Sequence, residues 1–429
     1  MPLESSASGP TRAWSWVPTL YYGQGLPYVV VMTVSTVLYK NLGVSNTDIA
    51  LFTSWLYLPW VIKPLWSPVI EFLGRKRAWV ITLQFAMAGG FALIALAIPG
   101  GTFFRTTLAL FWVVALSSAT HDIAADGFYL LALPPASQAA FVGVRSTFYR
   151  LAMLSGQGGL VWLAGRLDSH GLAPAWVQVF WLLAAGYGVL AFFNLVMMPH
   201  PPADNAAVRQ GNFGRDYLTA FVAFFQRPTL VRMLAFLLVY RFAEAQLLKL
   251  VNPFLLDRRE AGGLGLTDQQ VGILYGEFGV AALILGGILG GVAIARGGLR
   301  KWLWPMATAM SLPNLVFVYL ALAQPSNEMV IGASLVVEQF GYGFGFAAYL
   351  VYLMQMAEGP YRTAHYAIGT GFMALGMMIP GLWAGWLQER IGYTHFFGWV
   401  LIAAVPSLAV TFWVRRGLPD SRRAESAAR

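Results

Sequence analysis

Long apolar stretches separated by short polar ones set the pattern of this chain from end to end. Twelve of them reach about 20 residues or more, the length that an α-helix needs to cross a bilayer. They cover residues 15–39, 47–67, 78–98, 104–131, 140–165, 174–198, 229–255, 268–294, 302–323, 328–356, 361–387 and 393–414. The pattern predicts an all-α membrane protein with twelve transmembrane helices.

The longest polar stretch, residues 199–228, follows the sixth span and predicts a cytoplasmic linker between two halves. A weak internal repeat supports this division. Leu42–Asp48 opens the second span and Leu264–Asp268 opens the eighth, each with a Gly followed by a Thr-Asp pair that predicts a helix N-cap. We therefore expect two pseudo-symmetric six-helix bundles, residues 1–198 and 229–429, with a binding site at mid-membrane depth between them.

Composition agrees with this class, because 58% of the residues are hydrophobic and only 11% are charged, against about 25% charged in soluble proteins. Lys and Arg cluster in alternate loops, so the positive-inside rule explains the net charge of +9 without nucleic acid, and it places both termini in the cytoplasm. The first 13 residues lack the pattern of a cleavable signal peptide, and we expect the first helix to direct insertion.

Several chemistries have no support in the sequence. The chain has no cysteine, which excludes disulfides, thiolate nucleophiles and cysteine metal sites. The motifs GxxxxGK, HExxH and GxSxG are absent, and Gly341–Gly345 lacks the spacing and the preceding strand of a nucleotide loop. We therefore predict no enzyme activity, no ATP-driven transport, no cofactor and no metal.

The fourth span carries two aspartates at membrane depth. Asp122 and Asp126 are four residues apart, which puts both on one helix face, while His121 points about a quarter turn away. A carboxylate in a bilayer is costly and usually faces a bundle interior or a water-filled cavity. The pair can carry protons in transport, or it can form structural ion pairs with Arg145 and Arg150 of the fifth span. His121 is either a proton shuttle or a fixed hydrogen-bond partner.

Charged residues of the second half form another candidate group. Arg241 and Glu244 lie three apart, with Lys249 beyond them. One reading is an intrahelical pair with Lys249 reaching to the outer interface; the other is that Arg241 binds an anionic solute group while Glu244 exchanges a proton. Glu338 and Glu277 are single acids in apolar spans, and such acids are functional candidates by default.

Two further groups of residues suit helix packing, and the first of them also suits solute binding. Aromatic and amide side chains of the first two spans either contact a solute or pack the bundle: Tyr21, Gln24, Tyr28 and Trp60. Glycines of the eighth and eleventh spans predict close helix crossings: Gly286, Gly287, Gly290, Gly291, Gly376, Gly381 and Gly385.

A short motif joins the second and third spans. Ser67 is followed four residues later by Glu71, three residues after that by Gly74, and then by Arg75, Lys76 and Arg77. This spacing resembles the cytoplasmic signature of the major facilitator superfamily, although Ser67 and Glu71 replace the usual Gly and Asp. The resemblance implies a cytoplasmic gate in which the acid and the basic loop hold neighbouring helices together. The second-half equivalent keeps the basic residues and lacks the acid.

Several short sequence blocks point to a more specific relationship. The sequence is similar to AmpG-type muropeptide permeases at Gly25–Pro27, Lys63–Pro68, Gly74–Trp79, Ser118–Ile123 with Asp126, Tyr240–Glu244 and Glu338. The chain departs from them at His121, where AmpG carries Gln, and in having twelve spans where AmpG often has two more. Relatives with twelve spans include siderophore importers and acyl-CoA transporters.

The resemblance implies a monomeric, proton-coupled secondary transporter of the bacterial inner membrane, surrounded by lipid, with a cavity lined mainly by spans 1, 4, 7 and 10. The expected solute is a peptidoglycan-derived amino sugar, a muropeptide or a related oligosaccharide, moved into the cytoplasm. A siderophore importer and a drug exporter are alternatives on the same fold. A non-transporting receptor is an alternative of another class, although the sequence has no sizeable soluble domain. An intramembrane enzyme is a weaker alternative function.

Overall fold

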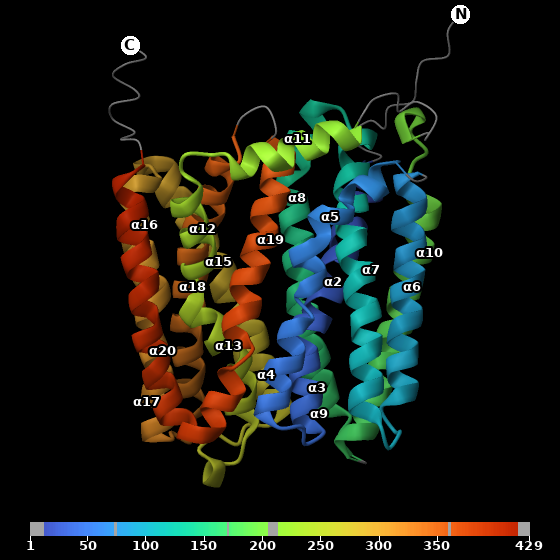
Figure 1. Cartoon of the computed structure of the whole chain (residues 1–429). Helices are drawn as coiled ribbons and strands as arrows, with labels where there is room; N and C mark the ends of the chain where they lie inside the picture. Colours follow the sequence, from blue (N-terminus) through green and yellow to red (C-terminus); the bar gives the residue numbers. More distant parts are fainter. Residues whose placement is uncertain (1–12, 73–74, 170, 205–212, 359–361, 419–429) are drawn as a thin grey trace, which may run out of the picture. The chain divides into compact units, whose positions relative to one another are not determined.

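The computed structural model describes residues 13–72, 75–169, 171–204, 213–358 and 362–418. These residues form helices and connecting turns, with no strand among them. By contacts the chain divides into two compact units, residues 1–38 with 62–215, and residues 39–61 with 216–429. The long helices of each unit run side by side (Figure 1).

In the first unit the helices follow the predicted spans closely. They are α2 (Val17–Val29), η1 (Val30–Val34), α3 (Ser35–Asn41), α5 (Leu58–Phe72), α6 (Lys76–Ala97), α7 (Phe103–Ala132), α8 (Pro135–Met153), η2 (Leu154–Leu160), α9 (Val161–Arg166), α10 (Leu172–Met197) and η3 (Pro202–Asp204), with α3 and α5 crossing into the second unit. Two spans contain a short π-helical stretch, η1 after Pro27 and η2 in the glycine-rich sequence Leu154–Leu160. Such bulges are frequent at functional positions.

Helix α2 is the centre of this unit, because it packs against both α7 and α8. A Cβ at Gly25 would lie 2.8 Å from the carbonyl oxygen of Tyr149, so only glycine lets α2 and α8 approach this closely. At one end Trp16, Phe128 and Tyr129 belong to a buried apolar cluster. This packing fixes the face of α2 that meets the aspartates of α7.

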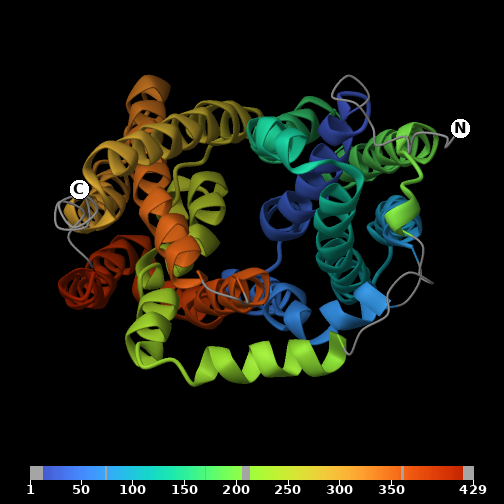
Figure 2. The ribbon, with the colours of Figure 1, turned by 90° about the horizontal axis from the view of Figure 1, so that it is seen from above.

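The second unit contains α4 (Asn46–Trp55), α11 (Phe213–Phe225), α12 (Leu230–Val239), α13 (Phe242–Leu256), η5 (Arg259–Ala261), α14 (Asp268–Val271), η6 (Gly272–Gly279), α15 (Val280–Gly297), α16 (Leu299–Ser311), η7 (Leu312–Asn314), α17 (Leu315–Ala323), α18 (Glu328–Met356), α19 (Arg362–Gly381) and α20 (Ala384–Arg416). Seen from above, α11 lies across the view (Figure 2). The bend between α11 and the α12–α13 span is 91°. The predicted polar linker therefore contains a helix, which the sequence reading missed.

Among the described residues, seven helical stretches are long and apolar enough to span a membrane, with α14–η6–α15 and α16–η7–α17 each counted as one stretch. The number rises to eight if the bent pair counts as one span. The other predicted spans correspond to α19 and to helices interrupted along their length, namely α2–η1–α3, α4–α5 and α8–η2–α9. Gly392, with φ +74°, breaks α20 close to the predicted boundary between the last two spans.

The repeat has a structural counterpart at both positions. Gly43 and Gly265 have φ values of +78° and +65°, which favour glycine. Thr267 caps α14 with a capping box, as predicted. The cap of α4 is Ser45, whose hydroxyl accepts the backbone N–H of Asp48 at 3.0 Å, so the predicted Thr-Asp cap is wrong there. Assignment of residues 1–198 and 229–429 to separate bundles stays a prediction.

Candidate functional site

The two aspartates of α7 both meet α2, as their spacing predicts. The Tyr21 hydroxyl donates to Asp126 Oδ1 at 3.0 Å, and Gln24 Nε2 donates to Asp122 Oδ1. Tyr21 and Gln24 are themselves one turn apart on α2. The facing sides of α2 and α7 therefore present four polar side chains to one another.

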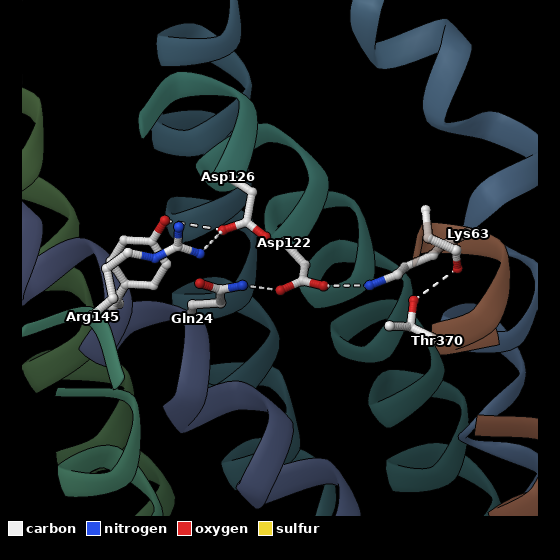
Figure 3. A network of polar contacts seen from close by, with 8 residues as sticks. Gln24, Lys63, Asp122, Asp126, Arg145 and Thr370 are labelled. Carbon is white, nitrogen blue, oxygen red and sulfur yellow. Dashed lines mark hydrogen bonds and ion pairs between the residues drawn. The ribbon is translucent and has the colours of Figure 1, made fainter. Parts of the chain in front are cut away.

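Each aspartate also forms an ion pair with a different helix. Lys63 Nζ of α5 lies 2.6 Å from Asp122 Oδ2, and Arg145 Nη2 of α8 lies 2.7 Å from Asp126 Oδ1. The two side chains diverge from α7, Asp126 toward Arg145 and Asp122 toward Lys63 (Figure 3). The Arg145 guanidinium also lies over the ring of Tyr21, 4.2 Å from its centroid, which is a favourable cation–π geometry.

These charged side chains are partly accessible. The exposed fraction is 15% for Lys63 and 21% for Asp122, and 28% for Arg145 and 47% for Asp126. Charges at membrane depth avoid hydrocarbon, so the accessible part of this network must face a polar environment. The network offers cations for an anionic group, and carboxylate, amide and hydroxyl groups for sugar or peptide hydrogen bonds.

The predicted ion pair with the fifth span is present for Arg145. Asp122 instead has Lys63 of α5 as its partner. Arg150 is half-buried five residues beyond Arg145 on α8, and its predicted role stays a prediction.

His121 lies on a different side of α7 and is buried. Its Nε2 is 3.1 Å from Gln84 Nε2 of α6, and Gln84 in turn accepts from Asn194 of α10. This arrangement matches the hydrogen-bond alternative for His121. Tyr28 is half-buried on α2 with its ring 6.5 Å from that of Tyr149, and Trp60 is buried in the second unit.

The predicted gate motif is described only in part. Gly74 and the side chain of Glu71 lie outside the described residues, and the Ser67 hydroxyl donates to the Pro64 carbonyl at 3.2 Å. Arg75 is exposed just before α6.

The next two residues of the motif are held by the segment that follows α10. The backbone N–H groups of Lys76 and Arg77 donate to the carboxylate of Asp204 at 2.7 and 3.0 Å. The Arg77 side chain donates to the carbonyl oxygens of Leu195 and Met198. These bonds fasten the start of α6 to the end of α10 and the segment that follows it.

In the second unit, Arg241 and Glu244 have separate partners. Arg241 lies at the break between α12 and α13, and its guanidinium donates to the Tyr342 hydroxyl of α18 and lies over the Phe346 ring. Glu244 is 1% exposed and accepts from Asn314 Nδ2 at 2.9 Å. These contacts connect α13 to other helices, in place of the predicted intrahelical pair.

Lys249 does not reach the outer interface as predicted. It is 4% exposed, donates to Thr53 Oγ1 at 2.9 Å, and lies 5.2 Å from the centroid of the Tyr57 ring. The ammonium group is therefore held inside the second unit between α13 and the segment 39–61.

The two single acids differ in burial. Glu338 is 1% exposed on α18 and accepts from Gln339 Nε2 at 3.0 Å; Gln339 also donates to the Tyr275 hydroxyl. Glu277 is exposed on η6, so the expectation of a buried acid there is wrong.

Sequence reasoning missed several polar partners: Lys63 as a counter-ion, Gln84, Asp204, Asn314 and Tyr342. A signal existed for Asn314, since Leu312-Pro313-Asn314 interrupts an apolar span and proline removes a backbone hydrogen bond from a helix. No comparable signal marked the others, because their partners come from distant parts of the chain.

Comparison with known proteins adds a sequence relationship. Residues 24–154 match the BT1 family. The anhydromuropeptide permease of Escherichia coli (strain K12) is 26% identical over 415 residues, covering 94% of this chain and 80% of that protein. A Rickettsia felis protein named putative transporter AmpG 4 is 25% identical over 406 residues, covering 91% and 94% of the two chains.

Solved structures match the fold over nearly the whole chain. A bacterial homologue of the human lysosomal transporter Spinster, in an inward-facing and occupied conformation, has a TM-score of 0.70 at 17% identity, covering 96% of this chain and 98% of that one. A D-xylose–proton symporter also has a TM-score of 0.70, at 10% identity and the same coverage. At such identities the agreement concerns the fold alone.

Proposed function

The chain is an AmpG-like multi-pass transporter of the major facilitator fold, and from this premise we propose that it imports a peptidoglycan-derived amino sugar or muropeptide together with protons. The membrane is the bacterial inner membrane, with both termini in the cytoplasm. The proposal rests on one observation above all: the partly accessible ion-paired network of Lys63, Asp122, Asp126 and Arg145 within membrane helices.

The chemistry of this network suits such a solute. A muropeptide joins a sugar, which offers hydroxyl and amide groups, to a peptide with a carboxylate. Arg145 suits a planar carboxylate, and Gln24 and Asp122 suit hydroxyl and amide groups. Because both cations already hold aspartates, an anionic solute group would compete with Asp122 or Asp126 for its partner.

Proton coupling follows from the same competition. An aspartate that loses its cation to the solute becomes a carboxylate without a counter-ion, which favours uptake of a proton. Glu244 and Glu338 are the corresponding buried acids of the second unit. In this mechanism proton binding and solute binding support each other, and release of both on the inner side restores the ion pairs.

Flux into proteoliposomes with a labelled muropeptide and an imposed pH gradient tests the proposal. We expect gradient-driven accumulation by the unmodified protein and its loss in the double variant Asp122→Asn/Asp126→Asn. Glu277→Asn, at an exposed position outside the network, is the control and should keep accumulation. Uptake in the double variant that remained complete and pH-dependent would contradict the proposed role.

The solute itself needs a separate measurement. Thermal-shift panels of muropeptides, amino sugars and siderophores on purified protein should show stabilisation by the first or second class, since ligand that binds only the folded state raises the melting temperature. Stabilisation by siderophores alone would overturn the choice of solute and leave the transporter assignment intact.

A further inference from the structure

A buried acid of the second unit lies next to two helix interruptions. Glu244 lies in the first turn of α13, which starts after the break at Tyr240 and Arg241. Asn314 ends the 3-10 turn η7, which separates α16 from α17. Their side chains are each 1% exposed and are joined by the 2.9 Å bond from Asn314 Nδ2 to Glu244 Oε1.

The remaining oxygens of this pair have an incomplete bonding pattern. Glu244 Oε2 and Asn314 Oδ1 are both buried, and neither has a hydrogen-bond partner among the described residues. Both are acceptors when Glu244 is ionised, and leaving buried acceptors unsatisfied is costly. A single hydrogen on Oε2 resolves this, because a neutral carboxylic acid both donates and accepts and can form two hydrogen bonds with one amide.

We propose that Glu244 is a proton-binding site, held as the neutral acid by a two-bond acid–amide pair with Asn314. Asn314 donates through Nδ2 to Oε1, and the acid donates from Oε2 to Oδ1. The proton arrives from water on one side of the membrane and leaves to water on the other, and no covalent bond besides O–H changes. The role of Glu244 in coupling rests on the proposed function, whereas its protonation does not.

The charged groups around Glu244 are consistent with this state. The positive charge of Arg241, just before α13, attracts Glu244, although the Arg241 side chain donates its hydrogen bond to Tyr342. The negative charge of Glu338 on α18 repels Glu244. Among the described residues, Tyr240 and Tyr342 also interact electrostatically with Glu244. In contrast, Asp122 and Asp126 each have a cation within 2.7 Å.

Infrared spectroscopy of the purified protein in lipid tests the proposal without a solute. The unmodified protein should show the carbonyl band of a protonated carboxylic acid at neutral pH, and Glu244→Gln should lose it. Glu277→Gln is the matched control at an exposed position and should retain the band, and Glu338→Gln shows whether Glu338 contributes to the band. An unchanged band in Glu244→Gln would overturn the proposal.

Asn314→Leu tests the pairing, since leucine keeps the approximate volume and removes both amide bonds. The Glu244 band should change frequency, and its midpoint in a pH titration should move. A band and midpoint that stay the same would show that Asn314 does not hold the acid.

Transport provides a second readout. Glu244→Gln should still exchange labelled for unlabelled solute across the membrane while pH-driven accumulation falls to the level without a gradient. Full accumulation by Glu244→Gln would overturn the coupling role. Absence of flux in the unmodified protein would instead contradict the proposed function and leave the infrared result standing.

Discussion

At the scale of single residues, the Lys63–Asp122 pair makes the first prediction. Asp122→Asn removes the counter-ion that lies 2.6 Å from Lys63 Nζ, with both side chains mostly buried. We expect a loss of about 1–3 kcal/mol in stability, between the values for exposed and fully buried pairs. Thermal melting of the purified protein measures this loss.

The control for this pair is the charge exchange Lys63→Asp/Asp122→Lys. If the interaction is direct, the double variant should recover part of the lost stability, and the double-mutant cycle gives the coupling. Additive losses would show that each side chain acts with other partners.

What the sequence could predict at this scale was the shared face of Asp122 and Asp126, because helix geometry alone decides it. Both aspartates do meet α2. The identity of the cation bonded to Asp122 was not predictable, since Lys63 lies 59 positions away and only the tertiary structure brings the two side chains together. Glu277 shows the converse: an apolar sequence neighbourhood does not tell which helix face is buried.

At the scale of helices, two adjacent glycines of α15 make a matched pair. A Cβ at Gly290 would lie 2.8 Å from the Phe344 carbonyl oxygen of α18, whereas a Cβ at Gly291 would have nothing within 4 Å. Gly290→Ala should therefore separate α15 from α18 and cost about 1–3 kcal/mol. Gly291→Ala should be neutral or stabilising by up to about 1 kcal/mol, the helix propensity difference.

Melting temperatures of the two variants decide this prediction. Equal effects of Gly290→Ala and Gly291→Ala would contradict the close crossing. The sequence singled out both glycines but could not separate them, because only the approach of α18 distinguishes one helix face from the next.

Helix interruptions were also outside the reach of the sequence. Hydropathy predicted the spans, and α18 begins and ends at the predicted residues. It did not predict the π-helical stretches η1, η2 and η6 or the break at Arg241, since an apolar pattern does not reveal local changes in backbone hydrogen bonding. The helix α11 was missed because a polar stretch was interpreted as a linker throughout.

At the scale of the whole molecule, the predicted major facilitator fold and AmpG-like relationship are confirmed by the superpositions and relatives. Twelve apolar spans and a few motif residues were sufficient for this, since bilayer thickness constrains helix length strongly. The division into units was less predictable. Residues 39–61 precede the linker but belong to the second compact unit, and only the tertiary contacts reveal this.

Several bonds fix that segment within the second unit. Lys40 pairs with Asp257 at 2.6 Å, and Asn46 Nδ2 donates to Gln388 Oε1 at 2.7 Å. The backbone N–H of Thr47 donates to Glu389 Oε1 at 2.9 Å. If the two six-span halves of the sequence are the moving bodies of the transport cycle, these bonds must break and form again in every cycle.

Cross-linking tests this requirement, and the absence of native cysteine makes it direct. Thr47→Cys/Glu389→Cys places two thiols where the Thr47 hydroxyl now donates to the Glu389 carboxylate at 2.5 Å. Joining them with a short reducible thiol cross-linker should abolish solute flux, and reduction should restore it, because the joined segment can no longer separate. Each single-cysteine variant treated in the same way should keep its flux. Undiminished flux in the fully cross-linked protein would mean that residues 39–61 move together with the second unit throughout the cycle, and that the moving bodies are the compact units and not the sequence halves.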